Sequence, residues 1–320
     1  MNTLKSLKNQ VNKVNKRQFT TTLKNFVGGN FHESKATKFY ETIDPATQKV
    51  ISRVPETTNE EFEVAVKNSH EAFKSWRNVP LLTRQRYVAD IAHLFRKNIQ
   101  EIGHTIAMEH GKTVPDAIGE VHRGLEAIDQ ASNIAPLYFG ETLENVSSHM
   151  DTYSYRSPLG VVSCIAPFNF PFMVPVWAFP YALATGNSVL MKPSEKVANS
   201  SDLIARLVQE ANLPAGVFNV VHGGAQTVTN ICTHKDIKAI SFVGGNSAGE
   251  YIYDVGSKHG KRVQSNMAAK NHAIVLPDCD KEEALNGLVG ASIGAGGQRC
   301  MAISVAVFVG KVSFIFYIKF

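Results

Sequence analysis

The sequence predicts an α/β fold built on a parallel, Rossmann-type sheet with helices on both faces. From Gly160 onward, short apolar runs alternate with runs of helical length, which is the pattern of repeated strand–helix units. The apolar runs are continuous, as expected for strands buried on both faces of a parallel sheet. Ligands of such sheets bind beyond the carboxyl ends of the strands, so functional residues are expected directly after each strand.

The first half of the chain is predicted to be rich in helices. Turn signals made of Gly, Asn, Asp and Pro separate short strands between residues 23 and 56. Thr58 or Asn59 then caps a helix that runs to about Trp76, with acidic side chains in its first turn. Two more helices are expected over about 82–109 and 116–138, and the polar residues 141–157 predict an exposed ribbon.

The second half supplies the predicted sheet. Its strands are expected over residues 161–165, 188–191, 217–221 and 237–243, and a further strand begins at Val263. The helices between them are expected over residues 173–183, 202–210, 227–232 and 248–255. The segments that follow these strands therefore belong to one edge of the sheet.

Three of those segments carry residues suited to an oxyanion or a nucleotide. Asn169 is a neutral amide donor that can stabilise an alkoxide, although a lone Asn more often satisfies a turn. Lys192 and Glu195 follow the second strand, where a carboxylate can accept from both hydroxyls of a ribose. Residues 244–249, Gly-Gly-Asn-Ser-Ala-Gly, open a helix whose backbone amides suit a pyrophosphate. This last signal is weak alone, because it is not G-x-G-x-x-G.

Cys300 is the candidate nucleophile. It ends the run Gly-Ala-Gly-Gly-Gln-Arg-Cys at residues 294–300, whose small residues allow a substrate and a cofactor to approach closely. The neighbouring Arg299 favours the thiolate, the form that attacks carbon. The alternative is that Cys300 is a small apolar residue of the core. None of the four cysteines forms a C-x-x-C pair, so no metal site is predicted.

The basic charge of the chain is concentrated near its beginning. Six Lys and Arg residues precede the first acid, Glu33, and without them the net charge of +5 becomes −1. A nucleic-acid surface is therefore not expected, and no apolar run approaches the roughly 18 residues of a membrane span. The acid-free leader, with apolar residues at helical spacing, predicts a mitochondrial transit peptide over residues 1–22 and a location in the matrix. A disordered basic tail is the alternative.

Five motifs carry a family resemblance. Pro-Phe-Asn-Phe-Pro, Met-Lys-Pro-Ser-Glu, Phe-Val-Gly-x-x-x-Ala-Gly, Asn-Met-Ala-Ala-Lys and Gly-Gln-Arg-Cys occur in this order. Over about residues 23–310 they resemble the aldehyde dehydrogenase superfamily, and within it the CoA-acylating methylmalonate-semialdehyde dehydrogenases. The resemblance implies an aldehyde dehydrogenase-like fold. It divides the chain into an NAD-binding domain over 23–143 and 158–268, an oligomerisation ribbon over 144–157 and a partial catalytic α/β domain over 269–310.

The resemblance also implies roles for individual residues. Cys300 would attack the aldehyde to give a thiohemiacetal and then a thioester, while the side-chain amide of Asn169 and the backbone N–H of Cys300 hold the oxyanion. Lys192 and Glu195 would bind the adenosine ribose, and Glu195 would favour NAD over NADP. The other positions implied to bind NAD are Ala166, Phe168, Lys196, Gly244, Gly245 and Gly249.

Asn266 distinguishes the chain from hydrolytic relatives, which carry a Glu as general base at this position. An amide cannot accept a proton near neutral pH, so the resemblance implies that coenzyme A takes the acyl group instead of water. The implied small-molecule substrates are malonate and methylmalonate semialdehyde, which lose carbon dioxide in valine and pyrimidine catabolism. Arg123 and Arg299 would bind their carboxylate. From the residues alone, Arg123 is better explained as a solvated helical charge.

The end of the chain departs from the family. Family members are homotetramers that continue beyond the strand at about 302–309, whereas residues 311–320 here are apolar and do not resemble them. We therefore expect a C-terminally truncated chain that lacks the oligomerisation strand and has little or no activity. Two alternatives stay open. One is a hydrolytic NAD-dependent aldehyde dehydrogenase, and the other is a non-catalytic truncated paralogue or a gene-model artefact.

Overall fold

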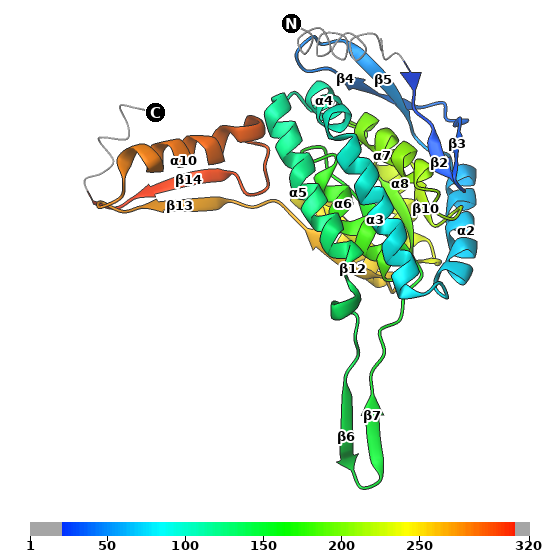
Figure 1. Cartoon of the computed structure of the whole chain (residues 1–320). Helices are drawn as coiled ribbons and strands as arrows, with labels where there is room; N and C mark the ends of the chain where they lie inside the picture. Colours follow the sequence, from blue (N-terminus) through cyan, green and yellow to red (C-terminus); the bar gives the residue numbers. More distant parts are fainter. Residues whose placement is uncertain (1–20, 311–320) are drawn as a thin grey trace, which may run out of the picture.

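The computed structural model describes residues 21–310 and is centred on a seven-stranded sheet with the order β12-β11-β8-β9-β10-β2-β3 (Figure 1). Five of these strands are parallel: β8 (Val161–Ile165), β9 (Ser188–Lys192), β10 (Phe218–Val220), β11 (Ile237–Val243) and β12 (Arg262–Asn266). The antiparallel hairpin of β2 (Asn25–Val27) and β3 (Asn30–His32) extends the sheet beyond β10. The predicted α/β fold with a parallel sheet is confirmed, with this hairpin added at one edge.

The register of the parallel strands brings their carboxyl ends to one level. Ile165 at the end of β8 pairs with Lys192 on β9 and with Phe242 on β11. Val243 at the end of β11 pairs with Asn266 at the end of β12. The segments that follow these four strands therefore emerge side by side at one edge of the sheet.

Helices cover both faces of the sheet. One face is covered by α3 (Leu81–Lys97), α4 (Ile99–His110), α5 (Val114–Ser132), α6 (Met173–Ala184) and α7 (Asn199–Glu210). The other face is covered by α2 (Asn59–Trp76), α8 (Ala225–Thr233) and α9 (Asn246–Lys258). Phe95, Phe172 and Phe179 are fully buried on the first face, and Phe62 is buried on the second. Burial of each such ring contributes about 1.5–3 kcal/mol to folding.

Two helix boundaries show how local side-chain bonds decide where a helix begins or ends. Thr58, one of the two caps that the sequence allowed, caps α2 through a reciprocal pair of bonds with Glu61. The single helix expected over 82–109 is instead two helices, because α3 ends at Asn98. The side-chain amide of Asn98 donates to the carbonyl of Leu94 at 2.8 Å, and its backbone leaves the helical region.

Three smaller units surround the main sheet (Figure 1). β1 (Thr21–Thr22), β5 (Val50–Pro55) and β4 (Phe39–Ile43) form a three-stranded sheet, and β6 (Thr142–Ser147) with β7 (Met150–Tyr153) forms an exposed hairpin. The third unit, β13 (Asn271–Val275), α10 (Lys281–Ile293) and β14 (Ile303–Phe308), packs around Val275 and Leu288 and projects from the body.

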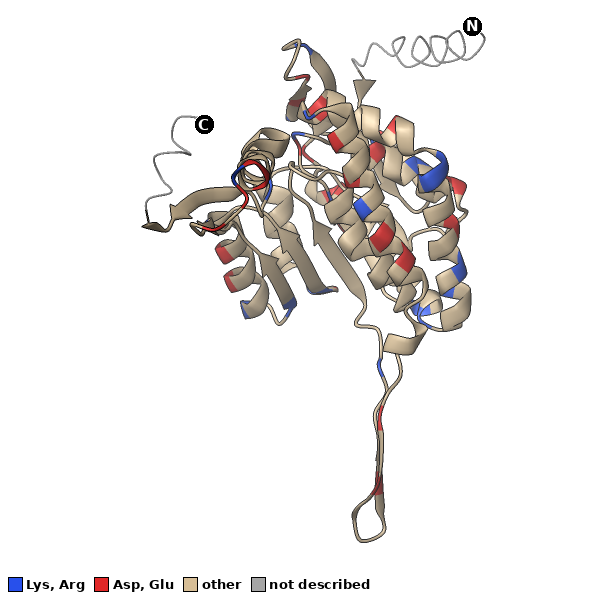
Figure 2. Ribbon diagram, turned by 60° about the vertical axis from the view of Figure 1, so that its left-hand side comes forward, with Lys and Arg blue, Asp and Glu red and all other residues tan. Residues whose placement is uncertain are grey.

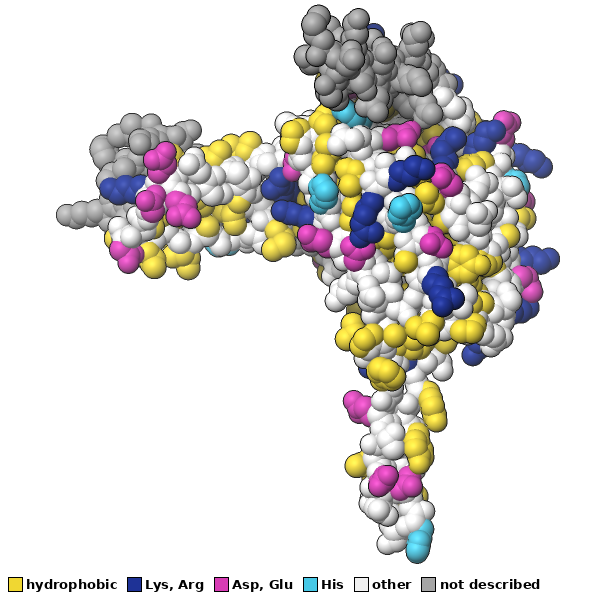
Figure 3. Space-filling model, in the orientation of Figure 1, with side chains coloured by type: hydrophobic (Ala, Val, Ile, Leu, Met, Phe, Trp, Pro, Cys, Tyr) yellow, Lys and Arg dark blue, Asp and Glu magenta, His cyan; other side chains and the backbone are white. Residues whose placement is uncertain are grey.

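The predicted leader and the predicted apolar tail fall largely outside this description. Residues 1–20 and 311–320 are not described, and Thr21–Thr22, at the end of the predicted leader, pairs with β5. Within residues 21–310, no helix is both long enough and apolar enough to cross a membrane. Acidic and basic side chains are interspersed over the helical face rather than gathered by sign (Figures 2 and 3).

A buried carboxylate, Glu109, joins the end of α4 to the start of α7. It accepts hydrogen bonds from the backbone N–H groups of Asn199 and Ser200 at 2.9 and 3.0 Å, and also from both of their side chains. Burial raises the pKa of Glu109 from its ordinary value of 4.5 to about 7, although these bonds oppose the shift.

This raised pKa predicts a specific pH dependence of stability. The folded protein retains the Glu109 proton at pH values where the unfolded chain has lost it, so the free energy of unfolding falls as pH rises from about 4.5 to about 7. An E109Q variant should lack this component, which is on the order of 3 kcal/mol at about 1.4 kcal/mol per pKa unit. Urea unfolding of both proteins at pH 4.5 and pH 8 measures it. An equal pH dependence in the two proteins would contradict the raised pKa.

Candidate active site

A cavity of about 1030 Å³ lies at the carboxyl edge of the sheet. Its walls come from the segments after β8, β9, β11 and β12, from the first turns of α8 and α9, and from residues 297–300. Ten of the twelve predicted site residues line it: Ala166, Phe168, Asn169, Lys192, Glu195, Lys196, Gly244, Gly245, Arg299 and Cys300. The fold thus brings the predicted catalytic and cofactor residues together in one place.

The other two predicted residues do not line this cavity. Gly249 lies one turn inside α9, where an added Cβ would approach the side chain of Met267 to 2.4 Å. Its glycine therefore allows α9 to pack closely against the segment after β12. Arg123 is exposed on α5, on the outer part of the molecule. The cofactor role of Gly249 and the substrate role of Arg123 stay predictions.

Left-handed backbone presents Cys300 at the cavity. Ala295, Gly296 and Gly297 have φ values of 54°, 63° and 74°, which form the predicted tight turn between α10 and the cysteine. This conformation costs a residue with a Cβ about 1–2 kcal/mol, so two of the three positions are glycine. The side-chain amide of Asn271 donates to the Cys300 carbonyl at 2.9 Å, which ties the loop to the start of β13.

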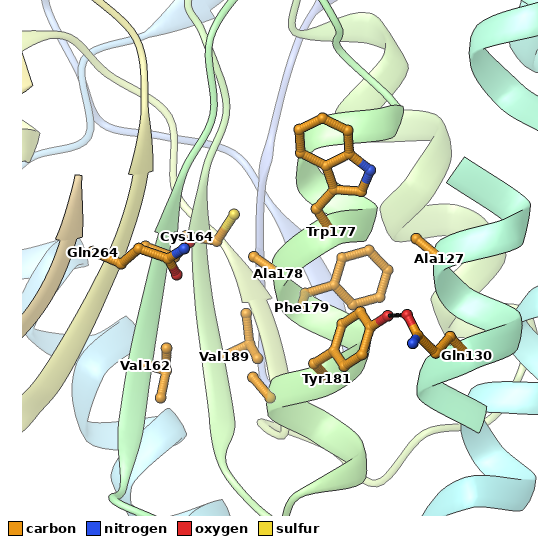
Figure 4. Close-up of a pocket in the computed structure, with 12 residues that line it drawn as sticks. Ala127, Gln130, Val162, Cys164, Trp177, Ala178, Phe179, Tyr181, Val189 and Gln264 are labelled. Atoms are coloured by element: carbon orange, nitrogen blue, oxygen red, sulfur yellow. Dashed lines mark hydrogen bonds between the residues drawn. The ribbon is translucent and has the colours of Figure 1, made fainter. Parts of the chain in front are cut away.

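Exposure separates Cys300 from the two buried cysteines. All four cysteines are free, and Cys300 and Cys279 are partly exposed. Cys164 is buried beside a second cavity of about 570 Å³ between α5, α6 and the sheet (Figure 4). Burial raises the pKa of the Cys164 thiol to about 12 and that of Cys232 to about 11. Thiols with such pKa values are poor nucleophiles at neutral pH, which leaves Cys300 as the candidate beside the large cavity.

The loop between β8 and α6, which carries Asn169, contacts the loop between α10 and β14, which carries Cys300. The side-chain Nδ2 of Asn169 donates to the carbonyl of Gln298, two residues before the cysteine, at 2.6 Å. The Oδ1 atom of Asn169 is buried and finds no hydrogen-bond partner among residues 21–310. An amide NH₂ carries two donor hydrogens, so the bond to Gln298 leaves one for a ligand. A neutral donor therefore lies against the loop that carries the candidate nucleophile.

Arg299 is already engaged by a carboxylate that the sequence did not single out. Its Nη2 donates to Oδ1 of Asp116, in the first turn of α5, at 2.8 Å. In the sequence Asp116 reads only as an acid at the start of a helix, so its role as a partner of Arg299 is a tertiary feature. A guanidinium has five N–H donors, so this ion pair leaves Arg299 with donors for a second carboxylate.

Lys192 and Glu195, the predicted ribose corner, lie against each other at the wall of the cavity. Lys192 Nζ lies 3.5 Å from Glu195 Oε2 and donates to the carbonyl of Pro193 at 2.8 Å. The Lys192 side chain is 4% exposed and that of Glu195 is 30% exposed, so the carboxylate is the accessible member. Burial lowers the pKa of Lys192, whereas the charge of Glu195 acts in the opposite direction.

An aromatic ring, Phe168, forms part of the same wall. His110 stacks on it, with ring centroids 6.2 Å apart, and Lys196 Nζ lies 5.1 Å from its ring centroid. Burial, aided by the charge of Lys112, lowers the pKa of His110 to about 4, so this imidazole is neutral at physiological pH. The wall therefore combines an aromatic face with the positive charge of Lys196.

The first turn of α9 fits an anionic group. Gly245 caps this helix without a side-chain hydrogen bond from the described residues, and a Cβ built there meets nothing within 4 Å. At Gly244, in contrast, a Cβ would lie 2.5 Å from the Phe242 ring. Uncapped amides at a helix N-terminus that borders a cavity suit a pyrophosphate. Within residues 21–310, no cluster of three or more His, Cys, Asp or Glu residues could hold a metal ion.

The exposure of the thiols predicts selective labelling. At pH 7.5, iodoacetamide should alkylate Cys300 at least about tenfold faster than Cys164 or Cys232, because their raised pKa values leave almost no thiolate. Peptide mapping by mass spectrometry measures the three rates, and a C300S variant identifies the Cys300 peptide. Comparable labelling of Cys164 in the folded protein would contradict the burial described here.

Comparisons with known proteins identify the family of the chain. The profile described as "Aldehyde dehydrogenase family" matches residues 31–316. The human mitochondrial methylmalonate-semialdehyde/malonate-semialdehyde dehydrogenase [acylating] is 50% identical over 290 residues, which cover 91% of this chain and 54% of that protein. The chain therefore spans about half the length of the curated relatives it matches.

Solved structures show the same fold. The methylmalonate-semialdehyde dehydrogenase of Oceanimonas doudoroffii has a TM-score of 0.91 and 41% identity, with 94% of this chain and 62% of that chain covered. A protein of Sinorhizobium meliloti 1021, solved in complex with NAD, has a TM-score of 0.91 and 37% identity, with 95% and 62% covered. The chain belongs to the aldehyde dehydrogenase family.

Proposed function

We propose that the large cavity is an NAD-dependent aldehyde-oxidising site that transfers its acyl group to coenzyme A. The observation that carries this proposal is the contact between the Asn169 amide and the Cys300 loop, in a cavity whose other walls suit a dinucleotide. A partly exposed thiol on a loop that contacts a neutral amide donor suits covalent catalysis at a carbonyl.

In the proposed reaction the thiolate of Cys300 attacks the aldehyde carbon and forms a C–S bond. The carbonyl oxygen becomes an oxyanion, which the Asn169 amide stabilises without adding a titrating group. Lys192 and Glu195 would hold the adenosine ribose, and Gly244, Gly245 and the first turn of α9 would hold the pyrophosphate. When bound, NAD supplies the hydride acceptor for the same carbon, so that the acyl group remains on Cys300 as a thioester.

Release of this thioester is proposed to need a thiol rather than water. Asn266 is exposed at the end of β12, directly before the cavity-lining residues Met267, Ala268 and Ala269. Its amide cannot activate water as a general base. The thiol of coenzyme A would attack the thioester carbon, and Cys300 would leave as thiolate. The bracketed word "acylating" in the names of the human and other relatives supports this step.

The proposed substrates are malonate and methylmalonate semialdehyde. They are taken from the names of the relatives, and Arg299 offers the cation that their carboxylate requires. The relatives are also named as mitochondrial, which supports a mitochondrial location for this chain.

We further propose that the exposed β6–β7 hairpin, which carries Leu143, Met150 and Tyr153 on its surface, contacts other subunits.

Trapping the acyl-enzyme tests the proposal without requiring turnover. The chain incubated with NAD and methylmalonate semialdehyde should gain an acyl group on Cys300, detectable by peptide mass spectrometry. Coenzyme A should remove this group at least about tenfold faster than buffer does, because the amide of Asn266 cannot activate water as a general base. Equally fast loss in buffer would indicate a hydrolytic enzyme. An adduct that persists in C300S, or the absence of any adduct, would contradict the proposed nucleophile.

Replacement of Glu195 tests the proposed ribose corner. E195Q removes the negative charge that would oppose the 2′-phosphate of NADP, while Lys192 stays in place to attract it. The ratio of the Kd for NADP to the Kd for NAD, measured by calorimetry, should fall about tenfold or more. E126Q, which changes an exposed carboxylate on α5, serves as the control. An unchanged ratio in E195Q would place the ribose elsewhere.

A further inference from the structure

A buried lysine holds the backbone of Asn169. Lys112 follows α4, and its Nζ donates to the carbonyl oxygen of Asn169 at 2.9 Å. The same Nζ lies 2.7 Å from Oε2 of Glu120 on α5 and 4.6 Å from the ring centroid of Phe170. Both charged side chains are 1% exposed. The ammonium group is therefore fixed between a carboxylate, a ring and the Asn169 backbone.

The carboxylate of this pair holds the other side of the same loop. Glu120 Oε1 accepts from the backbone N–H groups of Phe172 and Met173, at 2.9 and 3.1 Å. These groups lie at the start of α6, where helical amides have no intrahelical partner. The ion pair thus binds the loop at positions before and after Phe170 along the chain.

The helix that carries Glu120 also holds the cysteine loop. Asp116 lies one turn before Glu120 on α5 and accepts from Arg299, the residue that precedes Cys300. One helix is therefore bonded to both loops that meet at the bond between Asn169 Nδ2 and the Gln298 carbonyl. A shift of either loop along α5 would change the distance from the amide to the thiol.

We propose that Lys112 and Glu120 are positioning residues, which as a pair set the side-chain amide of Asn169 relative to the Cys300 loop. The proposal rests on the proposed role of Asn169 as oxyanion donor. A buried ion pair contributes little net stability, because desolvation offsets the attraction between the charges. Here the two charges also satisfy three backbone groups of a single loop, which apolar side chains cannot do.

The test compares K112M/E120Q with a matched control. The amide oxygen that E120Q introduces still accepts from the start of α6, so the main loss in the double variant is the bond to the Asn169 carbonyl. The control is K261M, because Lys261 is also buried and donates to two backbone carbonyls, those of His234 and Ile237, away from the cavity.

The first readout is the NMR resonance of the Asn169 side-chain amide, identified by its loss in N169A. The second is protection of Cys300 from iodoacetamide by methylmalonate semialdehyde, without NAD or coenzyme A.

K112M/E120Q should shift or broaden the Asn169 resonance. It should also weaken protection by the aldehyde about tenfold, which is a smaller effect than the loss of a whole oxyanion donor. K261M should change neither the resonance nor the protection. Adding N169A should weaken protection no further than N169A alone, because the pair acts through Asn169. An unchanged resonance, or additive losses, would overturn the proposal. If the double variant does not fold, the same resonance is measured in E120D, which retracts the carboxylate and keeps its charge. If the aldehyde fails to protect the wild-type thiol, the proposed function fails, and the resonance still decides the positioning role.

Discussion

The level carboxyl ends of four parallel strands are the constraint on which the rest of the site depends. Because β8, β9, β11 and β12 run in the same direction and end in register, their following segments converge at one edge of the sheet. The amide of Asn169, the ribose corner of Lys192 and Glu195, and the uncapped turn of α9 are each a local product of one strand end. The sheet itself is held by apolar packing on both faces, so the rigid part of the molecule carries the polar part.

The cysteine reaches this edge by a different route. Cys300 belongs to the unit of β13, α10 and β14, which has its own small core and projects from the body (Figure 1). Polar contacts bring its loop to the sheet: Gln298 meets Asn169, and Arg299 meets Asp116. Polar contacts of this kind contribute about 0.5–3 kcal/mol each, which is much less than burial of a hydrophobic core contributes. The Cys300 thiol is therefore held less firmly than the Asn169 amide. The buried pair of Lys112 and Glu120 matters for this reason, since it fixes the partner against which the thiol is aligned.

Sequence patterns predicted the features that depend on neighbours along the chain. The alternation of apolar strands and helices, the cap at Thr58 and the turn before Cys300 follow from local chemistry and were confirmed. The break at Asn98 was missed because a side-chain bond to Leu94 outweighed helical periodicity. Asp116, Lys112 and Glu120 read as ordinary charges of helix ends and surfaces, and only packing made them partners of Arg299 and Asn169. The predicted cofactor role of Gly249 stays a prediction, and packing of its helix against Met267 is a second reason for glycine there that the sequence did not show.

In the proposed site, the cavity at the carboxyl edge binds NAD with its adenosine half against Lys192 and Glu195. A crystal structure of the chain grown with NAD shows where the cofactor lies. We expect density for the ribose at Glu195, for the pyrophosphate at Gly244 and Gly245, and for the nicotinamide on the side of Cys300. NAD bound instead in the cavity lined by Trp177 and Tyr181 (Figure 4), or no bound NAD at saturating concentration, would contradict it.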